Sequence, residues 1–143
     1  MPMPVDLVDA VVAAIQAGTY SQTLVTAKKL APIYDREDVT GWTVDVYAGQ
    51  QTREHLTRSN LWTKTYSVGL IVRTDASGSA ADQETRAAEF LRVCQELMDR
   101  LGALNLAGVY PIEIEQDDPY DIGKVSESGL MQTTITIRYK GTI

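Results

Sequence analysis

The residues that could carry out chemistry are few. The chain of 143 residues contains one histidine, His55, and one cysteine, Cys94. A zinc or iron site needs several ligands that converge on one point, so such a site here would have to consist of carboxylates. Cys94 lies on an apolar stripe with helical spacing, where a cysteine usually packs as a small hydrophobic side chain. We therefore expect neither a metal centre nor a Cys–His catalytic pair.

The densest group of acidic residues is the run Glu113-Ile-Glu-Gln-Asp-Asp-Pro-Tyr-Asp121. It lacks the alternating oxygen ligands, the central glycine and the closing glutamate of a calcium-binding loop. The cluster Ser77-Gly-Ser79 lacks the lysine of a phosphate-binding loop and the spacing of a dinucleotide fingerprint. We interpret the acidic run as the solvated end of a strand and a loop, and we expect no cofactor and no enzymatic activity.

The polar segment 49–60 is the best candidate for contact with a partner. It joins two predicted strands with more residues than adjacent strands need. Its charged residues are Arg53, Glu54, His55 and Arg58. Arginine is enriched at protein–protein interfaces, so we predict that these four residues and the nearby Tyr47 lie at a subunit or partner interface. The alternative interpretation is an ordinary solvent-exposed loop.

A long strand at residues 61–74 is the element around which the chain is organised. One parity of this segment is apolar and consists of Trp62, Tyr66, Val68, Leu70 and Val72. The other parity is largely polar and includes Arg73. Because successive side chains of a strand point to opposite faces, we expect one buried face and one mostly polar face.

Further strands are predicted on either side of this element. Residues 42–48 alternate, with Trp42 inward and Asp45 and Tyr47 outward. Residues 110–115 and 130–140 also alternate, whereas a weaker pattern predicts a strand at 23–30. These segments supply the remaining strands of one sheet.

Two helices complete the predicted elements. Apolar residues recur at helical spacing over 6–17, and Gly18 follows at the position of a C-cap glycine. A second apolar stripe predicts a helix over 80–101, with Glu96 pairing to Arg92 and Arg100 on its solvated side. The element order α-β-β-β-α-β-β predicts a single α+β domain over residues 1–143, with both helices packed on one face of a mainly antiparallel sheet.

The charge balance restricts the possible partners. Thirteen basic and nineteen acidic residues leave a formal charge of −6. This balance argues against a surface that grips nucleic acid, but it does not exclude a protein that lets DNA slide past without binding it. The chain has no apolar run long enough to cross a bilayer and no basic N-terminal signal segment, so we expect a soluble protein made in a reducing cytoplasm.

The pattern of composition and element order resembles small virion proteins of tailed bacteriophages. The resemblance covers roughly residues 5–140. The segments that carry it are Ala27–Asp38, Trp42–Gly49, Arg58–Leu70 and Met131–Tyr139. The family it resembles most is that of the tail terminator, or tail-completion, proteins, which join head and tail.

This resemblance implies a non-catalytic α+β subunit that assembles as a ring, often a hexamer, at the head-proximal end of the tail tube. Such a ring ends tube polymerisation and docks the head connector. The implied partners are further copies of the chain, the tail tube protein, the head–tail connector or head-closure protein, and genomic DNA that passes through the bore without sequence-specific binding. The implied location is the virion tail or neck, reached from the host cytoplasm during assembly, with no membrane involved.

Two other functions are compatible with the same fold class. A small ligand-binding or regulatory module would need a concave apolar pocket with a few convergent polar groups. An enzyme would need the acidic residues of 113–121, or His55, to show perturbed titration within a cleft. The resemblance favours the structural virion protein over both.

Overall fold

The computed structural model describes residues 4–28, 41–55, 62–75, 80–106, 108–117 and 130–142. Its elements are α1 (Pro4–Gln16), β1 (Leu24–Lys28), β2 (Trp42–His55), β3 (Trp62–Asp75), α2 (Ala80–Gly102), β4 (Tyr110–Gln116) and β5 (Leu130–Thr142). The predicted order α-β-β-β-α-β-β is thereby confirmed. Neither described helix is both long and apolar enough to span a membrane.

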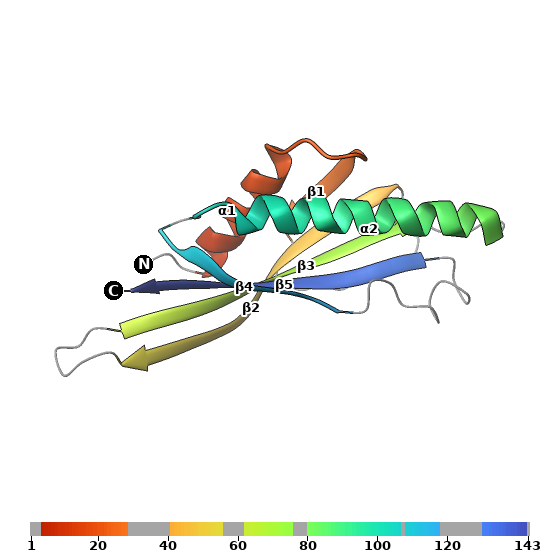
Figure 1. Cartoon of the computed structure of the whole chain (residues 1–143). Coiled ribbons are helices and arrows are strands. Elements are labelled where there is room, and N and C mark those ends of the chain that lie inside the picture. Colours follow the sequence, from red (N-terminus) through yellow and green to blue (C-terminus); the bar gives the residue numbers. More distant parts are fainter. Residues whose placement is uncertain are drawn as a thin grey trace.

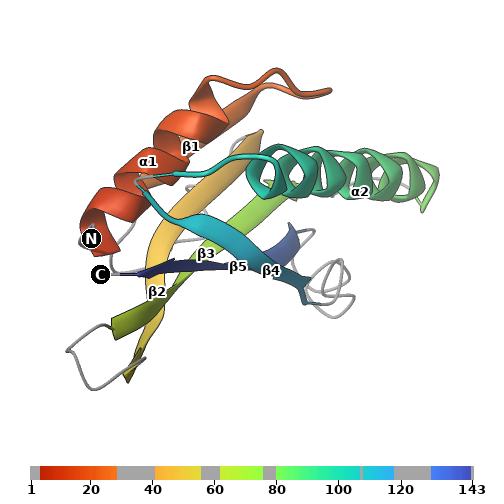
Figure 2. The same cartoon turned by 60° about the vertical axis from the view of Figure 1, so that its left-hand side comes forward.

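The strands form one sheet in the order β1-β2-β3-β5-β4. β1 pairs with β2 in parallel, whereas the other three pairings are antiparallel. Both helices lie on the same side of this sheet (Figures 1 and 2). The α+β class, the mainly antiparallel sheet and the helices on one face are as predicted from the sequence.

The helix-covered face contains the hydrophobic core. The register aligns Val46 with Leu70 and Leu70 with Ile135, so buried side chains form continuous rows across the three central strands. On the helices, Val11 and Leu97 are fully buried. Burying one such side chain contributes roughly 1.5–3 kcal/mol, so these rows are the main reason why the helices pack on this face.

The two helices are also joined by polar contacts at the C-terminal end of α1. Arg100 Nε on α2 donates a hydrogen bond of 2.7 Å to the carbonyl of Ala14 on α1. The hydroxyl of Tyr20, in the segment after α1, donates one of 2.8 Å to the carbonyl of Ile15 at the end of the same helix. Ser21 N donates to the Glu96 carboxylate at 2.9 Å. Glu96 and Arg100 therefore bond to the α1 end and the segment after it, instead of forming the predicted pair along α2.

β2 is longer than the sequence pattern predicts. Residues 49–55, predicted as a connection, continue the strand to His55 and remain paired with β3. The register shifts between Ala48 and Gln51, which is a bulge or irregularity that interrupts the two-residue alternation. The alternation therefore breaks at a point where the strand itself continues. Arg58, at the other end of the predicted connection, lies outside the described residues.

The face without helices is not uniformly exposed. Asp45 and Arg73, predicted on the outward or polar parity, are both buried there, and Arg73 Nη2 lies 2.9 Å from Asp45 Oδ2. Ile71 on the same face is also buried. Asp45 and Arg73 therefore lie on the predicted face, but they are buried on it, because the two opposite charges on neighbouring strands compensate each other and can be buried together.

Candidate functional site

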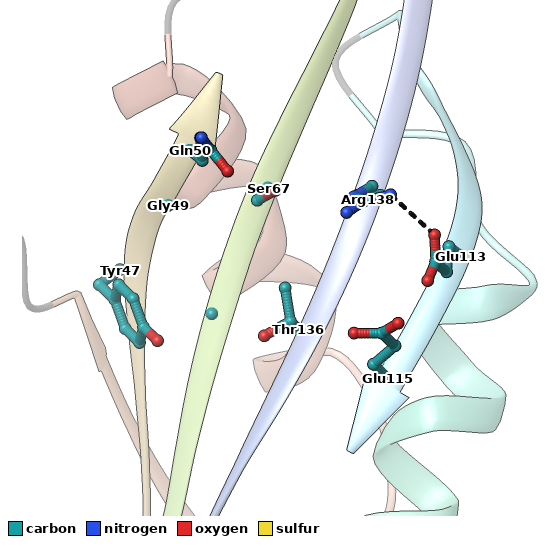
Figure 3. A pocket seen from close by; sticks show the side chains of 9 residues that line it. Tyr47, Gly49, Gln50, Ser67, Glu113, Glu115, Thr136 and Arg138 are labelled. Atoms are coloured by element: carbon teal, nitrogen blue, oxygen red, sulfur yellow. Dashed lines mark hydrogen bonds and ion pairs between the residues drawn. The ribbon is translucent and has the colours of Figure 1, made fainter. Parts of the chain in front are cut away.

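The face without helices contains a shallow hollow of about 260 Å³. It spans β2, β3, β5 and β4, so every strand except β1 contributes to it (Figure 3). The lining residues are Tyr47, Gly49, Gln50, Ser67, Gly69, Glu113, Glu115, Thr136 and Arg138. The strand register brings these residues together from distant parts of the sequence.

Two rows of paired residues build the hollow. In the first row, Gly69 of β3 pairs with Tyr47 of β2 and Thr136 of β5, and Thr136 pairs in turn with Glu115 of β4. In the second row, Ser67 pairs with Arg138, which pairs with Glu113. Because alternate residues of a strand share a face, the two rows lie next to each other on one surface.

The tyrosine in the first row lies over a glycine. A Cβ built on Gly69 would lie 2.5 Å from the Tyr47 hydroxyl oxygen, so the ring occupies the space that a side chain at Gly69 would need. Figure 3 shows the ring turned from β2 toward β3. Partial burial raises the pKa of Tyr47, and the nearby negative charge of Asp117 raises it further.

The outer wall of the hollow is acidic. Arg138 Nη1 lies 2.9 Å from Glu113 Oε2, and this ion pair crosses from β5 to β4. A hydrogen bond with Glu113 raises the pKa of Glu115, and the charges of Glu113 and, less strongly, Asp117 act in the same direction, whereas Arg138 lowers it. The carboxylates of Glu113, Glu115 and Asp117 thus carry more negative charge than the single positive charge of Arg138 can compensate.

Of the predicted interface residues, Tyr47 and Arg53 have side chains that the structure describes, and these two lie apart. Tyr47 lines the hollow, whereas Arg53 lies beyond the register shift, on the opposite face of the sheet, and is exposed. Arg53 lies close enough to Tyr66 that its charge lowers the pKa of that phenol, although burial raises the pKa more. Arg53, Glu54 and His55 pair in register with Lys64, Thr63 and Trp62. The side chains of Glu54 and His55, like Arg58, lie outside the described residues.

The sequence interpretation did not identify the acidic wall as part of a site. The sequence interpretation places Glu113 and Glu115 at a solvated strand end, and Arg138 falls within the predicted strand at 130–140. The available signal was their spacing, because alternate acids on one predicted strand can face a basic residue on another. Nothing in the sequence indicates, however, that β4 pairs with β5.

Two kinds of reactive group can be assessed among the described residues, a metal site and the thiol of Cys94. Within the described ranges, no three His, Cys, Asp or Glu residues are grouped so that they could hold a metal ion. Cys94 is buried, as predicted, and burial raises the pKa of its thiol to about 12. At neutral pH this thiol is protonated and therefore a poor nucleophile.

Both edges of the sheet carry exposed apolar side chains. Val25 on β1 is 61 % exposed, and Tyr110 and Ile112 on β4 are each 47 % exposed. The outer side of an edge strand presents backbone N–H and C=O groups that no neighbouring strand occupies, so an edge is a natural place for contact with another chain. The two edges lie at opposite sides of the same sheet.

The chain matches no protein-family profile and no curated protein sequence. Among solved structures, it is similar to a chain from the virion of a native gene transfer agent particle, with a TM-score of 0.47 and 16 % sequence identity. The similarity covers 95 % of this chain and 94 % of that one. A likeness at this level assigns neither a family nor a function.

Proposed function

We propose that the chain is a structural virion protein of a tailed phage, which assembles as a ring at the head-proximal end of the tail tube. In this role it is a tail terminator that ends tube polymerisation and docks the head connector, without catalysis or a cofactor. The sequence resemblance motivates this role. The structural observation that carries it is the pair of sheet edges with exposed apolar side chains, β1 on one side and β4 on the other.

Two different edges suit a ring made of one kind of subunit. When one surface of a subunit binds a different surface of the next, the contact is heterologous and generates a closed ring or an open filament. β1 and β4 differ in length, in charge and in pairing direction, so they are different surfaces. A hexamer is the ring size that the resemblance favours.

The net charge agrees with a bore through which DNA passes. A formal charge of −6 on each subunit gives a ring a strong negative charge. Phosphate binding depends on basic side chains that release counterions, so such a ring repels the DNA backbone overall. Passage without retention is what a head–tail joint needs.

The hollow favours surface contact over a small ligand. Small-molecule pockets usually measure about 300–1,000 Å³ and are mostly apolar. The hollow on the open face measures about 260 Å³ and is lined by charged and polar side chains from four strands. We therefore place the ligand-binding module second.

The test is the native mass of the purified protein across a concentration series, combined with negative-stain microscopy. We expect rings of several subunits, alone or on tail tubes assembled from a phage tail tube protein. Ile112→Lys should weaken the assembly, because it places a charge on the β4 edge. Leu91→Lys on α2 is the matched control, since Leu91 is 43 % exposed and Ile112 is 47 % exposed. A protein that stays monomeric up to millimolar concentration and does not bind tail tubes would overturn the proposal.

A further inference from the structure

We infer that neighbouring subunits of the ring are joined by a charged contact between two surfaces of this chain. The first surface is the cationic arm, formed by Arg53 and Lys64 at the end of the β2–β3 hairpin. The second is the acidic edge, formed by Glu113, Glu115 and Asp117 on and just after β4. The cationic arm of one copy binds the acidic edge of the next. This inference rests on the proposed ring and specifies its subunit contact.

The cationic arm places two like charges directly opposite each other. Arg53 and Lys64 are register partners in the antiparallel β2–β3 ladder. Like charges at such positions destabilise a sheet, because their Cβ atoms are only about 4.5–5.5 Å apart. Within the described part of the chain, no acidic residue forms an ion pair with either of them. Figures 1 and 2 show this end of the hairpin extending away from both helices. Arg53 is exposed and Lys64 partly exposed, and among the described side chains neither has a compensating anion.

The acidic edge carries an excess of negative charge. Glu113, Glu115 and Asp117 follow one another at a spacing of two, and Asp117 continues the pairing toward β5 through a bond of 3.0 Å from its N–H to the carbonyl of Thr134. Arg138 forms an ion pair with Glu113. A side-chain hydrogen bond with Glu113 raises the pKa of Glu115, and the negative charge of Glu113 raises it further, as expected where negative charge is incompletely compensated. A further cation at this edge would stabilise the ionised carboxylates.

The arm of a subunit cannot reach its own acidic edge. β3 and β5 lie between Arg53 on β2 and the acidic edge on β4, and β5 lies between Lys64 on β3 and that edge. The parities also differ, because Lys64 shares the parity of the core residue Tyr66, whereas Glu113 and Glu115 line the hollow on the opposite face. Charge complementarity between two distinct surfaces of one chain therefore points to a second copy as the occupant, and such a contact is heterologous, as a ring requires.

The experiment exchanges the charges. Arg53→Glu with Lys64→Glu reverses the arm, and Glu115→Lys with Asp117→Lys reverses the edge. Glu113 is left unchanged because it pairs with Arg138 within the subunit. Either reversal alone should weaken subunit association at least about tenfold, since two favourable pairs become repulsive. The chain that carries all four substitutions should assemble again, because the two exchanged pairs of charges are then complementary.

A matched control reverses charges elsewhere on the surface. Glu84→Lys with Arg92→Glu changes two exposed residues of α2, and it should leave assembly unchanged. Urea denaturation of each variant confirms that the subunit still folds. Loss of assembly in each reversed variant and recovery in the fourfold variant is the expected result.

Three other results would overturn the inference and can be told apart. Rings that are lost with Ile112→Lys but unaffected by both charge reversals would place the contact elsewhere and leave the proposed function intact. Loss of DNA-fragment binding on arm reversal, with assembly unchanged, would assign the arm to nucleic acid. Absence of rings in the unmodified protein, alone and on tail tubes, would remove the proposed function itself.

Discussion

The ring of Tyr47 on β2 lies across Gly69 on β3 and occupies the space in which a side chain at position 69 would lie. The two residues are direct register partners, so the glycine leaves room for the aromatic ring of its neighbour. A glycine within a strand costs roughly 0.5–1 kcal/mol relative to alanine, because it loses more backbone freedom on folding. The packing of Tyr47 offsets this cost and forms one wall of the hollow.

Because the ring of Tyr47 covers Gly69, the effect of Gly69→Ala on the free energy of unfolding should change sign when Tyr47 is replaced. Gly69→Ala should destabilise the protein by about 1 kcal/mol, since the new methyl group displaces the ring of Tyr47. In a Tyr47→Ser background, the same substitution should stabilise by about 0.5 kcal/mol, because only the backbone term remains. Urea denaturation of the four proteins in a double-mutant cycle measures the coupling. Equal effects in both backgrounds would show that the two residues do not interact.

The elements that could be predicted from the sequence are those in which apolar residues recur at a regular spacing without interruption. The strand around Leu70 and the helix around Cys94 each show one clear apolar face, and both faces are buried in the structure. β2 was predicted too short because its alternation is interrupted between Ala48 and Gln51, where the register shifts. A period in one segment indicates which side chains share a face, but not where a bulge lets the strand continue.

The candidate site could be predicted only in part, because it depends on which strands become neighbours. Tyr47 was identified, but Glu115 and Arg138 belong to the site through the pairing of β4 with β5 and of β5 with β3. Sequence periodicity is local and contains no information about that pairing. For the same reason, the parity of Asp45 could not reveal that Arg73 of the adjacent strand would be buried with it.

The buried pair of Asp45 and Arg73 should contribute far more to stability than an exposed pair. Removing one partner of a buried ion pair leaves an uncompensated charge and costs about 3–5 kcal/mol, so Asp45→Ala should destabilise the fold by that amount. The control is Asp9→Ala, which breaks the pair with Lys28 and should cost less than about 1 kcal/mol. The side chains of Arg73 and Asp45 are 4 % and 6 % exposed, whereas those of Lys28 and Asp9 are 40 % and 52 % exposed. Denaturation midpoints that shift equally would contradict the assigned burial.

Arg100 should stabilise the C-terminal end of α1 from its position on α2. Its guanidinium donates to the carbonyl of Ala14, one of the last carbonyls of the helix, and its charge suits the negative end of the helix dipole. A hydrogen bond to a charged group contributes about 1.5–3 kcal/mol, so Arg100→Met should lower the free energy of unfolding by about 2 kcal/mol. Hydrogen exchange should also become faster at the amides of Ala17 and Gly18, which bond to the last turn.

The control for this prediction is Arg92→Met on the exposed side of α2. Arg92 is exposed, and its loss should change stability by no more than about 0.5 kcal/mol. If the two substitutions cost the same, the contribution of Arg100 comes from helix propensity or surface charge and not from the end of α1.

The buried thiol of Cys94 should make the fold sensitive to alkaline pH. Burial raises the pKa of this thiol to about 12 in the folded protein, whereas an exposed thiol in the unfolded chain titrates near pH 8.5. The protonated thiol therefore favours the folded state below the unfolded pKa. This contribution is lost as the pH rises toward the folded pKa, because the unfolded chain then releases a proton that the folded protein retains.

The loss should reach about 2 kcal/mol by roughly pH 10, given about 1.4 kcal/mol for each pH unit above the unfolded pKa. Tyr139 has a raised pKa for the same reason, so the whole protein includes its contribution as well. Comparing the unmodified protein with Cys94→Ala by urea denaturation at both ends of this pH range isolates the thiol. The unmodified protein should lose about 2 kcal/mol more than the variant, and the folded thiol should resist alkylation at pH 8 until urea unfolds the chain. Equal pH dependence in the two proteins, or rapid alkylation without denaturant, would show that Cys94 is accessible to solvent in the folded state.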